Sequence, residues 1–259
     1  MGQTLKIPAR GLSASELLAA WERGTGQPPA GKAVTLLAAS APEVPPERLA
    51  RLSIGQRDAC LFTLRELTFG SRLVALATCP FCAERLELSF DVAEIRAGPP
   101  TALVAAQDEE EMEAHTASVA DYEVTFRLPD SRDLDAARSD DPEAGRQELV
   151  RRCLLVCHNR GEPRPIGELP AEVVAAVVEE MERLDPQGDV QLALACPSCG
   201  REWHATFDIV SFFWSEIDAW AYRMLREVHA LASAYGWSEA EILAMSQWRR
   251  HMYLTMVGE

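Results

Sequence analysis

The sequence is short of basic residues and has no long hydrophobic run. Lysine and arginine together number 25 against 40 aspartate and glutamate residues, which gives a formal net charge of −15 at pH 7. Nucleic acids and anionic membrane surfaces are bound by clustered Lys and Arg, and no stretch is apolar for long enough to cross a bilayer. We therefore expect a partner that is neither a nucleic acid nor a membrane.

Targeting signals are also missing from the first residues. No apolar segment follows Met1, so we expect no secretory signal. Lys6 occupies the position where a myristoylation motif needs Ser or Thr. The seven cysteines are an odd number, and nothing in the sequence points to an oxidising compartment, where disulfides persist. These features predict a cytoplasmic protein.

The familiar motifs of catalysis are absent as well. The sequence contains no Walker A loop, no Gly-x-Gly-x-x-Gly and no nucleophile elbow. The aspartates between Asp130 and Asp141 do not match a calcium loop, and the acidic run 108–111 is typical of a solvated loop rather than a metal or basic-partner site. We therefore predict that the protein is not an enzyme. None of the five histidines lies in a zinc-hydrolase helix motif: His115, His158, His204, His229 and His251.

Two copies of a Cys-Pro-x-Cys motif are the strongest positive signal. They begin at Cys79 and Cys196, and each lies between two runs that alternate as strands do. At the same constant offset of 117 residues, Phe90 matches Phe207 and several neighbours also match. Such a repeat predicts an internal duplication of a strand–knuckle–strand unit, in which the knuckle is the turn that contains Cys-Pro-x-Cys. The four strand-like runs are 73–78, 85–92, 190–195 and 202–209.

The spacing of the cysteines predicts a metal site. Two thiolates separated by two residues can reach one metal from a tight turn, and structural zinc takes four ligands in a tetrahedron. We therefore predict one structural zinc per chain, bound by Cys79, Cys82, Cys196 and Cys199. Iron in the same four-thiolate site stays open, as does the replacement of one ligand by His204.

Other interpretations of the cysteines are less well supported. A thioredoxin-like motif normally opens a helix, whereas residues 85–90 alternate, and structural disulfides would need an oxidising compartment. Of the remaining cysteines, we expect Cys60 to be a small core residue. Cys153 and Cys157 would share a face of a predicted helix and, with His158, could form a second metal site. No fourth ligand is evident, so core packing is favoured.

Capping signals locate several helices. Ser13 with Glu16, Ser53 with Gln56, and Ser238 with Glu241 each match the capping box. Helices are predicted at 13–23, 30–40, 54–69, 141–159, 170–184 and 212–235, with two more after Ser238 and at 247–256, and a strand at 122–128.

These elements predict an α+β fold in which helical regions surround two duplicated strand–Cys-Pro-x-Cys–strand hairpins that share one structural zinc. We divide the chain into an N-terminal helical segment at 1–52, a region with both hairpins at 53–210, and a C-terminal helical segment at 211–259. The aromatic stripe of the last segment is typical either of a core or of a docking face. We place the candidate partner surface at 212–256.

Several short motifs follow one another in a recognisable order. From about residue 53 onward this order resembles the baseplate-protein family of contractile-tailed phages, in the zinc-knuckle form found alongside phage-like contractile injection systems. The segment from His229 to Tyr253 is also similar to phage tail-assembly chaperones. The motifs are Ile54-Gly55-Gln56-Arg57-Asp58, Phe69-Gly70, the first knuckle, Phe126-Arg127-Leu128-Pro129, Arg132-Asp133-Leu134, the second knuckle, Tyr235-Gly236-Trp237-Ser238-Glu239, and Arg249-Arg250 with Tyr253.

The resemblance implies a non-catalytic structural or assembly role, with baseplate or hub proteins as partners and assembly in the cytoplasm. The first 50 residues carry no resemblance. The alternative is a zinc-ribbon adaptor or regulator that binds a protein partner and is unrelated to tails.

Overall fold

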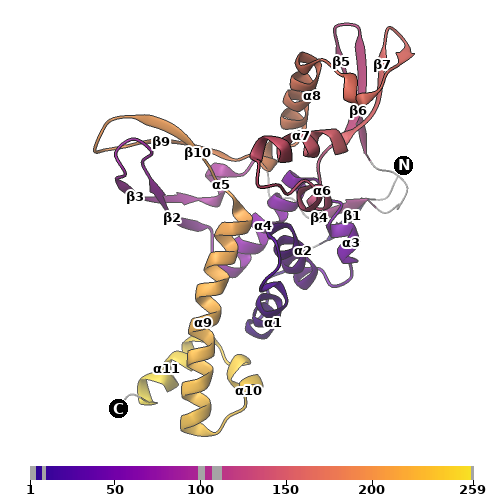
Figure 1. The fold of residues 1–259 in the computed structure, drawn as a ribbon. Coiled ribbons are helices and arrows are strands. Elements are labelled where there is room, and N and C mark those ends of the chain that lie inside the picture. Colours follow the sequence, from indigo (N-terminus) through magenta and orange to yellow (C-terminus); the bar gives the residue numbers. More distant parts are fainter. Residues whose placement is uncertain (1–3, 8–9, 99–102, 107–112, 258–259) are drawn as a thin grey trace.

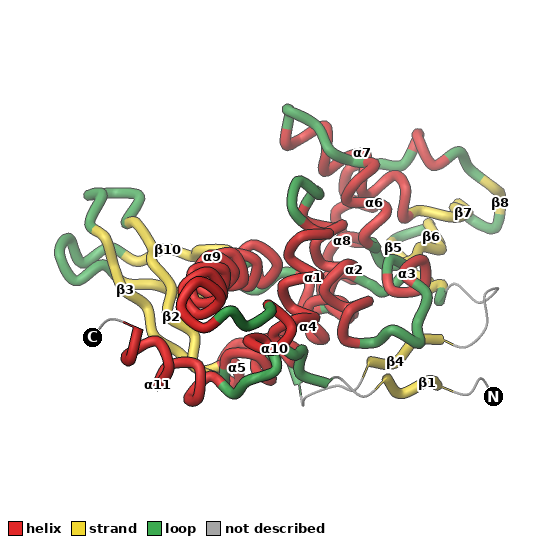
Figure 2. The backbone as a smooth tube through the Cα atoms, turned by 90° about the horizontal axis from the view of Figure 1, so that it is seen from below, coloured by secondary structure: helices red, strands yellow, loops and turns green. Residues whose placement is uncertain are grey.

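The computed structural model describes residues 4–7, 10–98, 103–106 and 113–257, and it combines helices with small antiparallel sheets. This mixture confirms the α+β class. Figure 1 shows a helical centre from which two hairpins, a second sheet and a long C-terminal helix extend in different directions. In Figure 2 the hairpins and the larger sheet lie on opposite sides of that centre.

The helical centre is built from the first helices of the chain and the beginning of a much later one. Their apolar faces meet in the largest buried cluster, where Leu36, Phe62 and Phe213 are fully buried. Cys60 lies in the same cluster, as expected of a small core residue. The helices are α1 (Ala14–Gly24), α2 (Pro29–Ser40), α3 (Pro46–Leu49), α4 (Ile54–Phe69) and α9 (Ile209–Tyr235).

The three predicted capping boxes are all present. In each, a serine side chain accepts a hydrogen bond from a backbone N–H and the residue three positions on bonds back to the serine N–H, which satisfies donors that a helix start leaves free. They begin α1, α4 and α10 (Glu239–Leu243). Gly236 ends α9 with a φ of +70°, a left-handed conformation that glycine adopts without strain.

Two separate antiparallel hairpins extend from the helical centre. β2 (Arg72–Thr78) pairs with β3 (Arg85–Asp91), and β9 (Gln191–Ala195) pairs with β10 (Glu202–Thr206). The turn of each hairpin contains one Cys-Pro-x-Cys motif. The short helix α5 (Val92–Ile95) follows the first hairpin, whereas the long α9 follows the second.

The predicted strand at 202–209 is too long at its end. Asp208 accepts a hydrogen bond from the backbone N–H of Val210 and caps α9, so the helix already begins at Ile209. A short side-chain acceptor at this position favours a helix start over a continued strand.

A four-stranded antiparallel sheet in the order β5–β6–β7–β8 forms the second core together with the helices beside it. Val124, Phe126 and Val177 are fully buried in this second core. The predicted strand at 122–128 is confirmed as β6. The elements are β5 (Ala114–Val119), β6 (Tyr122–Arg127), α6 (Ser131–Ala136), α7 (Pro142–Cys153), β7 (Leu154–Asn159), β8 (Glu162–Pro163), η1 (Ile166–Glu168), α8 (Ala171–Leu184) and η2 (Pro186–Gly188).

The helix predicted at 141–159 is wrong in its second half. α7 ends at Cys153, and the next residues form β7, which pairs with β6. The run Leu154–Cys157 is apolar, and its backbone groups are satisfied by the sheet ladder instead of by helix bonds. Cys153 and Cys157 therefore do not share a helix face. Both are buried in the second core, so core packing is the correct interpretation.

The C-terminal helices fold back on the far end of α9. Val228 and Leu231 of α9 pack against Ile242 of α10, and α11 (Gln247–Val257) lies beside them (Figure 1). At the other end of the chain, β1 (Thr4–Ile7) pairs with β4 (Leu103–Ala106). Among the described helices, none has the combination of length and apolarity that spanning a membrane requires.

Candidate metal centre

The two Cys-Pro-x-Cys turns have the same backbone hydrogen bonds. In the first, Cys79 N–H donates to the carbonyl of Glu84 over 2.8 Å, and in the second, Cys196 N–H donates to the carbonyl of Arg201 over 2.9 Å. A positive φ recurs at the same place, with +60° at Ala83 and +71° at Gly200. Each sequence therefore folds locally into a turn that directs two cysteines toward one side.

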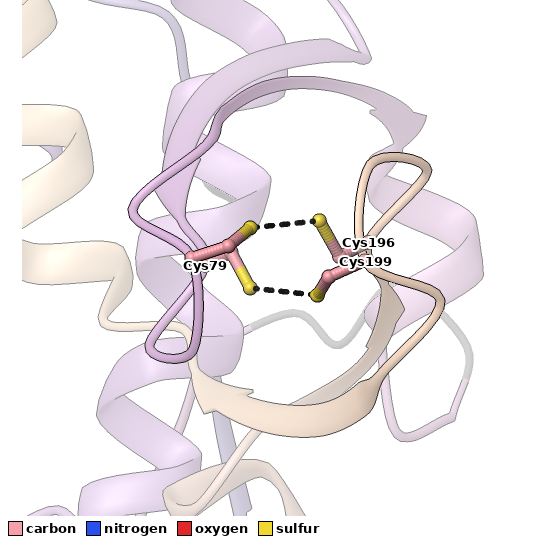
Figure 3. A group of neighbouring side chains, drawn as sticks. Cys79, Cys196 and Cys199 are labelled. Carbon is pink, nitrogen blue, oxygen red and sulfur yellow. Dashed lines mark hydrogen bonds between the residues drawn. The ribbon is translucent and has the colours of Figure 1, made fainter.

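The four predicted cysteines come together where the two hairpin turns meet. All four Sγ atoms lie within 4.8 Å of one another. Cys79 Sγ is 3.8 Å from Cys199 Sγ, and Cys82 Sγ is 3.6 Å from Cys196 Sγ (Figure 3). The first cysteine of each motif is buried and the second is exposed. Neither contact is a disulfide, because an S–S bond is about 2.05 Å long.

The spacing of the sulfurs fits a tetrahedral metal ion. Zinc–sulfur bonds of about 2.3 Å in a regular tetrahedron place the sulfurs about 3.8 Å apart. The two contacts between the hairpins match this value. The cluster can therefore hold a metal ion such as zinc between two segments that are far apart in the sequence.

Hydrogen bonds favour a thiolate at Cys79. Burial opposes its ionisation, but backbone N–H groups of Phe81 and Cys82 and the neighbouring thiols donate to its sulfur, so its pKa falls to about 7. At Cys82 the backbone N–H of Glu84 favours the thiolate, whereas burial and the neighbouring thiols raise the pKa to about 12. The pKa values of these two thiols thus shift in opposite directions, and a bound cation would favour the thiolate form of both.

Two further contacts join the hairpins. At the tip, the Arg201 guanidinium lies 4.8 Å from the ring centroid of Phe81, so a residue of the second turn stacks on one of the first. At the base, Phe90 and Phe207 contact each other with centroids 5.6 Å apart. Phe207 also stacks on Phe62 of α4, which anchors the base of both hairpins in the core.

The other candidate ligands do not join this centre. His204 is exposed on β10 and is not one of the four clustered groups. Within the described part of the chain, no second group of three or more potential ligands is found, so Cys153, Cys157 and His158 do not form one. The acidic run 108–111 lies outside the described residues.

Two motifs of the family resemblance, residues 54–58 and 126–129, contact each other in the structure. Residues 54–58 begin α4, and the loop before α6 lies against them: Ile54 N–H donates to the Pro129 carbonyl over 3.0 Å. Arg57 donates to Ser131 over 3.4 Å and to Asp58 over 2.7 Å, and all three side chains are buried. The two motifs therefore hold the helical centre against the second core.

A usable signal for this contact was present in the sequence. Asp130 and Asp133 form a capping box that begins α6, with aspartate in place of glutamate at the third position. Asp133 also pairs with Arg127 and Arg152. A capping box with aspartate at its third helical position therefore predicts the start of α6.

Comparison with known proteins gives one match. No curated protein and no solved structure is found to be similar, whereas a family model described as T4 bacteriophage base plate protein matches residues 32–214. The match begins inside α2, whereas the expected start of the resemblance was about residue 53. It ends before the segment His229–Tyr253, so the similarity of that segment to tail-assembly chaperones stays a prediction. Because the match spans more than half of the chain, this protein belongs to the T4 bacteriophage base plate protein family.

Proposed function

We propose that the chain is a non-catalytic structural or assembly protein of the baseplate or hub of a phage tail or related contractile injection system. The observation that carries the proposal is the cluster of four cysteine sulfurs at the meeting point of two hairpins. Four thiolates complete the tetrahedron of a zinc ion and leave no open position for a substrate or water. Such a site stabilises a fold and performs no reaction. The family membership favours this role over that of an adaptor unrelated to tails.

One structural zinc per chain would join the hairpins, with Cys79, Cys82, Cys196 and Cys199 as its ligands. The metal would close a loop of more than a hundred residues, and the free chain would lose conformational entropy on closure. Matching hydrogen bonds in the two turns support the hypothesis that the hairpins arose by duplication.

The partner surface proposed at 212–256 is supported by the exposed side chains of α11. Trp248 is 73% exposed, and Met252 and Met256 follow it at intervals of four residues. This spacing places the three on one side of the helix, while Tyr253 and Leu254 pack toward α9 and α10. An exposed Trp–Met stripe suits docking to another baseplate or hub protein. Assembly would take place in the cytoplasm.

The division into segments 1–52, 53–210 and 211–259 remains part of the proposal. It assigns the metal site to the middle segment and the partner surface to the last. The family match includes the whole of the middle segment and only the first four residues of the last. The two roles can therefore be tested separately.

The test of the metal site compares the wild type with Cys196→Ser and with Ser198→Ala, an exposed residue in the same turn. We expect one zinc per chain by elemental analysis in the wild type and in Ser198→Ala. Cys196→Ser should lose the metal and unfold at a lower temperature. Equal metal content and stability in all three would contradict the zinc site, and iron in place of zinc would correct its identity.

The test of the assembly role uses particles from cells that lack the gene. We expect particles with incomplete baseplates, and we expect the wild-type gene to restore them. Normal baseplates in its absence would contradict the role.

A further inference from the structure

A cavity of about 670 Å³ lies between the two hairpins. It is bordered by β3 on one side and β9 on the other, and by α5 and the segment after η2 near the helical centre. This volume is within the range of sites that hold a small molecule or a short peptide segment. The metal centre closes the hairpin tips beside it, but the cavity itself contains no cysteine.

The strand edges that border the cavity are unpaired among the described residues. β3 pairs only with β2, and β9 only with β10. In β9, the hydrogen bond from Phe207 N–H to the Val190 carbonyl fixes which residues bond across the hairpin. Residues that bond to the partner strand alternate with residues that do not in an antiparallel pair. Val190, Leu192 and Leu194 therefore bond across the hairpin. Gln191 and Ala193 direct their N–H and C=O groups away from β10 instead.

The same argument applies to β3. Val92 N–H donates to the Ser71 carbonyl and Cys79 N–H to the Glu84 carbonyl, so Glu87 and Ser89 direct their backbone groups away from β2. The cavity is thus bordered by two rows of free N–H and C=O groups. Free strand edges of this kind accept an added strand.

The charges around the cavity are predominantly negative. Glu87, Glu94 and Asp189 are exposed at its border, whereas the side chain of its basic residue, Arg96, is only 5% exposed and pairs with Glu66 over 2.9 Å. The Nε atom of Arg96 is buried and has no hydrogen-bond partner among the described residues. Arg96 therefore adds no accessible positive charge to the border of the cavity.

Apolar side chains cover the rest of the lining. Phe90, Ile95 and Leu192 are half-buried there, so each leaves part of its surface available for contact. An occupant that alternates apolar and basic side chains would place the first against these residues and the second against the carboxylates.

We propose that this cavity binds an extended, basic segment of another protein, which adds as a strand to the free edge of β9. The proposal goes beyond the baseplate role because it names a second interface and the chemistry of its partner. It depends on the proposed zinc site only in that the metal would fix the hairpin tips.

The test uses the full-length, metal-loaded protein and the capped pentapeptide Lys-Val-Lys-Val-Lys, with Glu-Val-Glu-Val-Glu as its acidic counterpart. We expect the basic peptide to shift the backbone NMR signals of residues 87–90 and 190–194, and the acidic peptide to leave them in place. Equal binding of both peptides, shifts elsewhere, or no binding of the basic peptide at 1 mM, about the weakest affinity of interest, would overturn the proposal.

A matched pair of variants tests the strand edge. Ala193 and His204 face each other across the β9–β10 hairpin, and neither uses its backbone N–H in that ladder. Proline at either position removes only an outward N–H, and only Ala193 borders the cavity. We expect Ala193→Pro to weaken peptide binding at least tenfold and His204→Pro to leave it unchanged. An equal effect of both would contradict strand addition to β9.

Metal content is measured on every sample. If the protein holds its zinc but does not bind the basic peptide, the proposed peptide site in the cavity is contradicted and the proposed function stays intact. A protein that binds the peptide without zinc contradicts the metal site alone.

Discussion

Phe90 and Phe207 occupy the same position in two hairpins, and their rings contact each other edge to face with centroids 5.6 Å apart. The next residue in each hairpin caps a helix: Asp91 begins α5 and Asp208 begins α9. The cysteine contacts are reciprocal, since the first cysteine of each motif contacts the second cysteine of the other. Reciprocal contacts of this kind are typical of a two-fold interface, so one chain has the contact pattern of a symmetric dimer.

This base contact should contribute to stability independently of the metal. We expect Phe207→Ala to lower the free energy of unfolding by about 2–4 kcal/mol, because the change removes packing against both Phe90 and Phe62. Phe81→Ala at the exposed tip is the control, with a much smaller effect. Denaturant titration measures both, and a double-mutant cycle with Phe90→Ala should give a coupling of about 1 kcal/mol. Additive effects would show that the two rings are energetically independent.

Removal of the metal should destabilise only a protein that can bind it. We expect a zinc chelator to lower the thermal midpoint of the wild type and of Ser198→Ala, and to leave that of Cys196→Ser unchanged. A ligand present at a thousand times its Kd stabilises the native state by about 4 kcal/mol. Calorimetry with and without chelator measures the shift. A Cys196→Ser midpoint that falls with chelator as far as the wild type's would contradict metal binding by this residue.

Gly55 fits a position where a side chain would clash. A Cβ atom there would lie 2.1 Å from Asp185 Oδ1 and 2.9 Å from the backbone nitrogen of Gly188, and Gly55 N–H donates to Asp185 over 2.8 Å. We expect Gly55→Ala to cost about 1–3 kcal/mol, because α4 must move away from the segment before β9. Gly167→Ala, with open space around it, is the control in the same unfolding measurement. Equal stability of both variants would contradict this close approach.

Asp58 should make stability depend on pH. Burial raises its pKa to about 6, against the partial compensation by Arg57. A carboxyl whose pKa is higher in the folded state binds more protons there, so its contribution to stability is lost as the pH rises from about 4 to about 6. A shift of this size corresponds to on the order of 3 kcal/mol.

The test measures the free energy of unfolding between pH 4 and pH 6 in the wild type and in Asp58→Asn. We expect the free energy of unfolding of the wild type to fall relative to that of Asp58→Asn as the pH rises, and to stay constant relative to that of Asp121→Asn, at the exposed pair with Arg160. The same pH dependence in Asp58→Asn as in the wild type would assign the effect to other groups.

The exposed stripe of α11 should affect assembly without affecting folding. Trp248→Glu places a charge at a residue that is 73% exposed, so we expect a thermal midpoint within about 2 °C of the wild type. Incorporation into particles, measured by complementation of a deletion strain, should fall at least tenfold. Gln247→Glu, the neighbouring exposed residue, is the control, and normal assembly of Trp248→Glu would contradict the proposed partner surface.

Local signals made much of the fold predictable. Ser53 and Gln56 fix the start of α4 through bonds made within one turn, and α4 runs from Ile54 to Phe69 as expected. The strand β7 was missed because its apolar run follows α7 without a helix stop signal. Its conformation is decided by pairing with β6, a contact between residues some thirty positions apart. Local propensity does not encode such contacts.

The candidate metal site was predictable in its membership and not in its arrangement. The spacing of Cys79 with Cys82 and of Cys196 with Cys199 identified all four sulfurs that cluster. The close contacts are between the motifs, 79 with 199 and 82 with 196, and they follow from how the hairpins face each other. The cavity between β3 and β9 has the same origin, since free strand edges are visible only once the pairing is known.

The helix α9 begins at the last residue position of the hairpin repeat and continues for 27 residues. At about 1.5 Å per residue this is a rod of about 40 Å. Its first turns are fixed in the helical centre through Ile209 and Phe213, and its far end carries α10 and α11. A helix without an internal break transmits orientation along its length, so a small rotation of the hairpin pair would displace the far end by a larger distance. The chain has the mechanical layout of a lever whose short arm is the pair of hairpins.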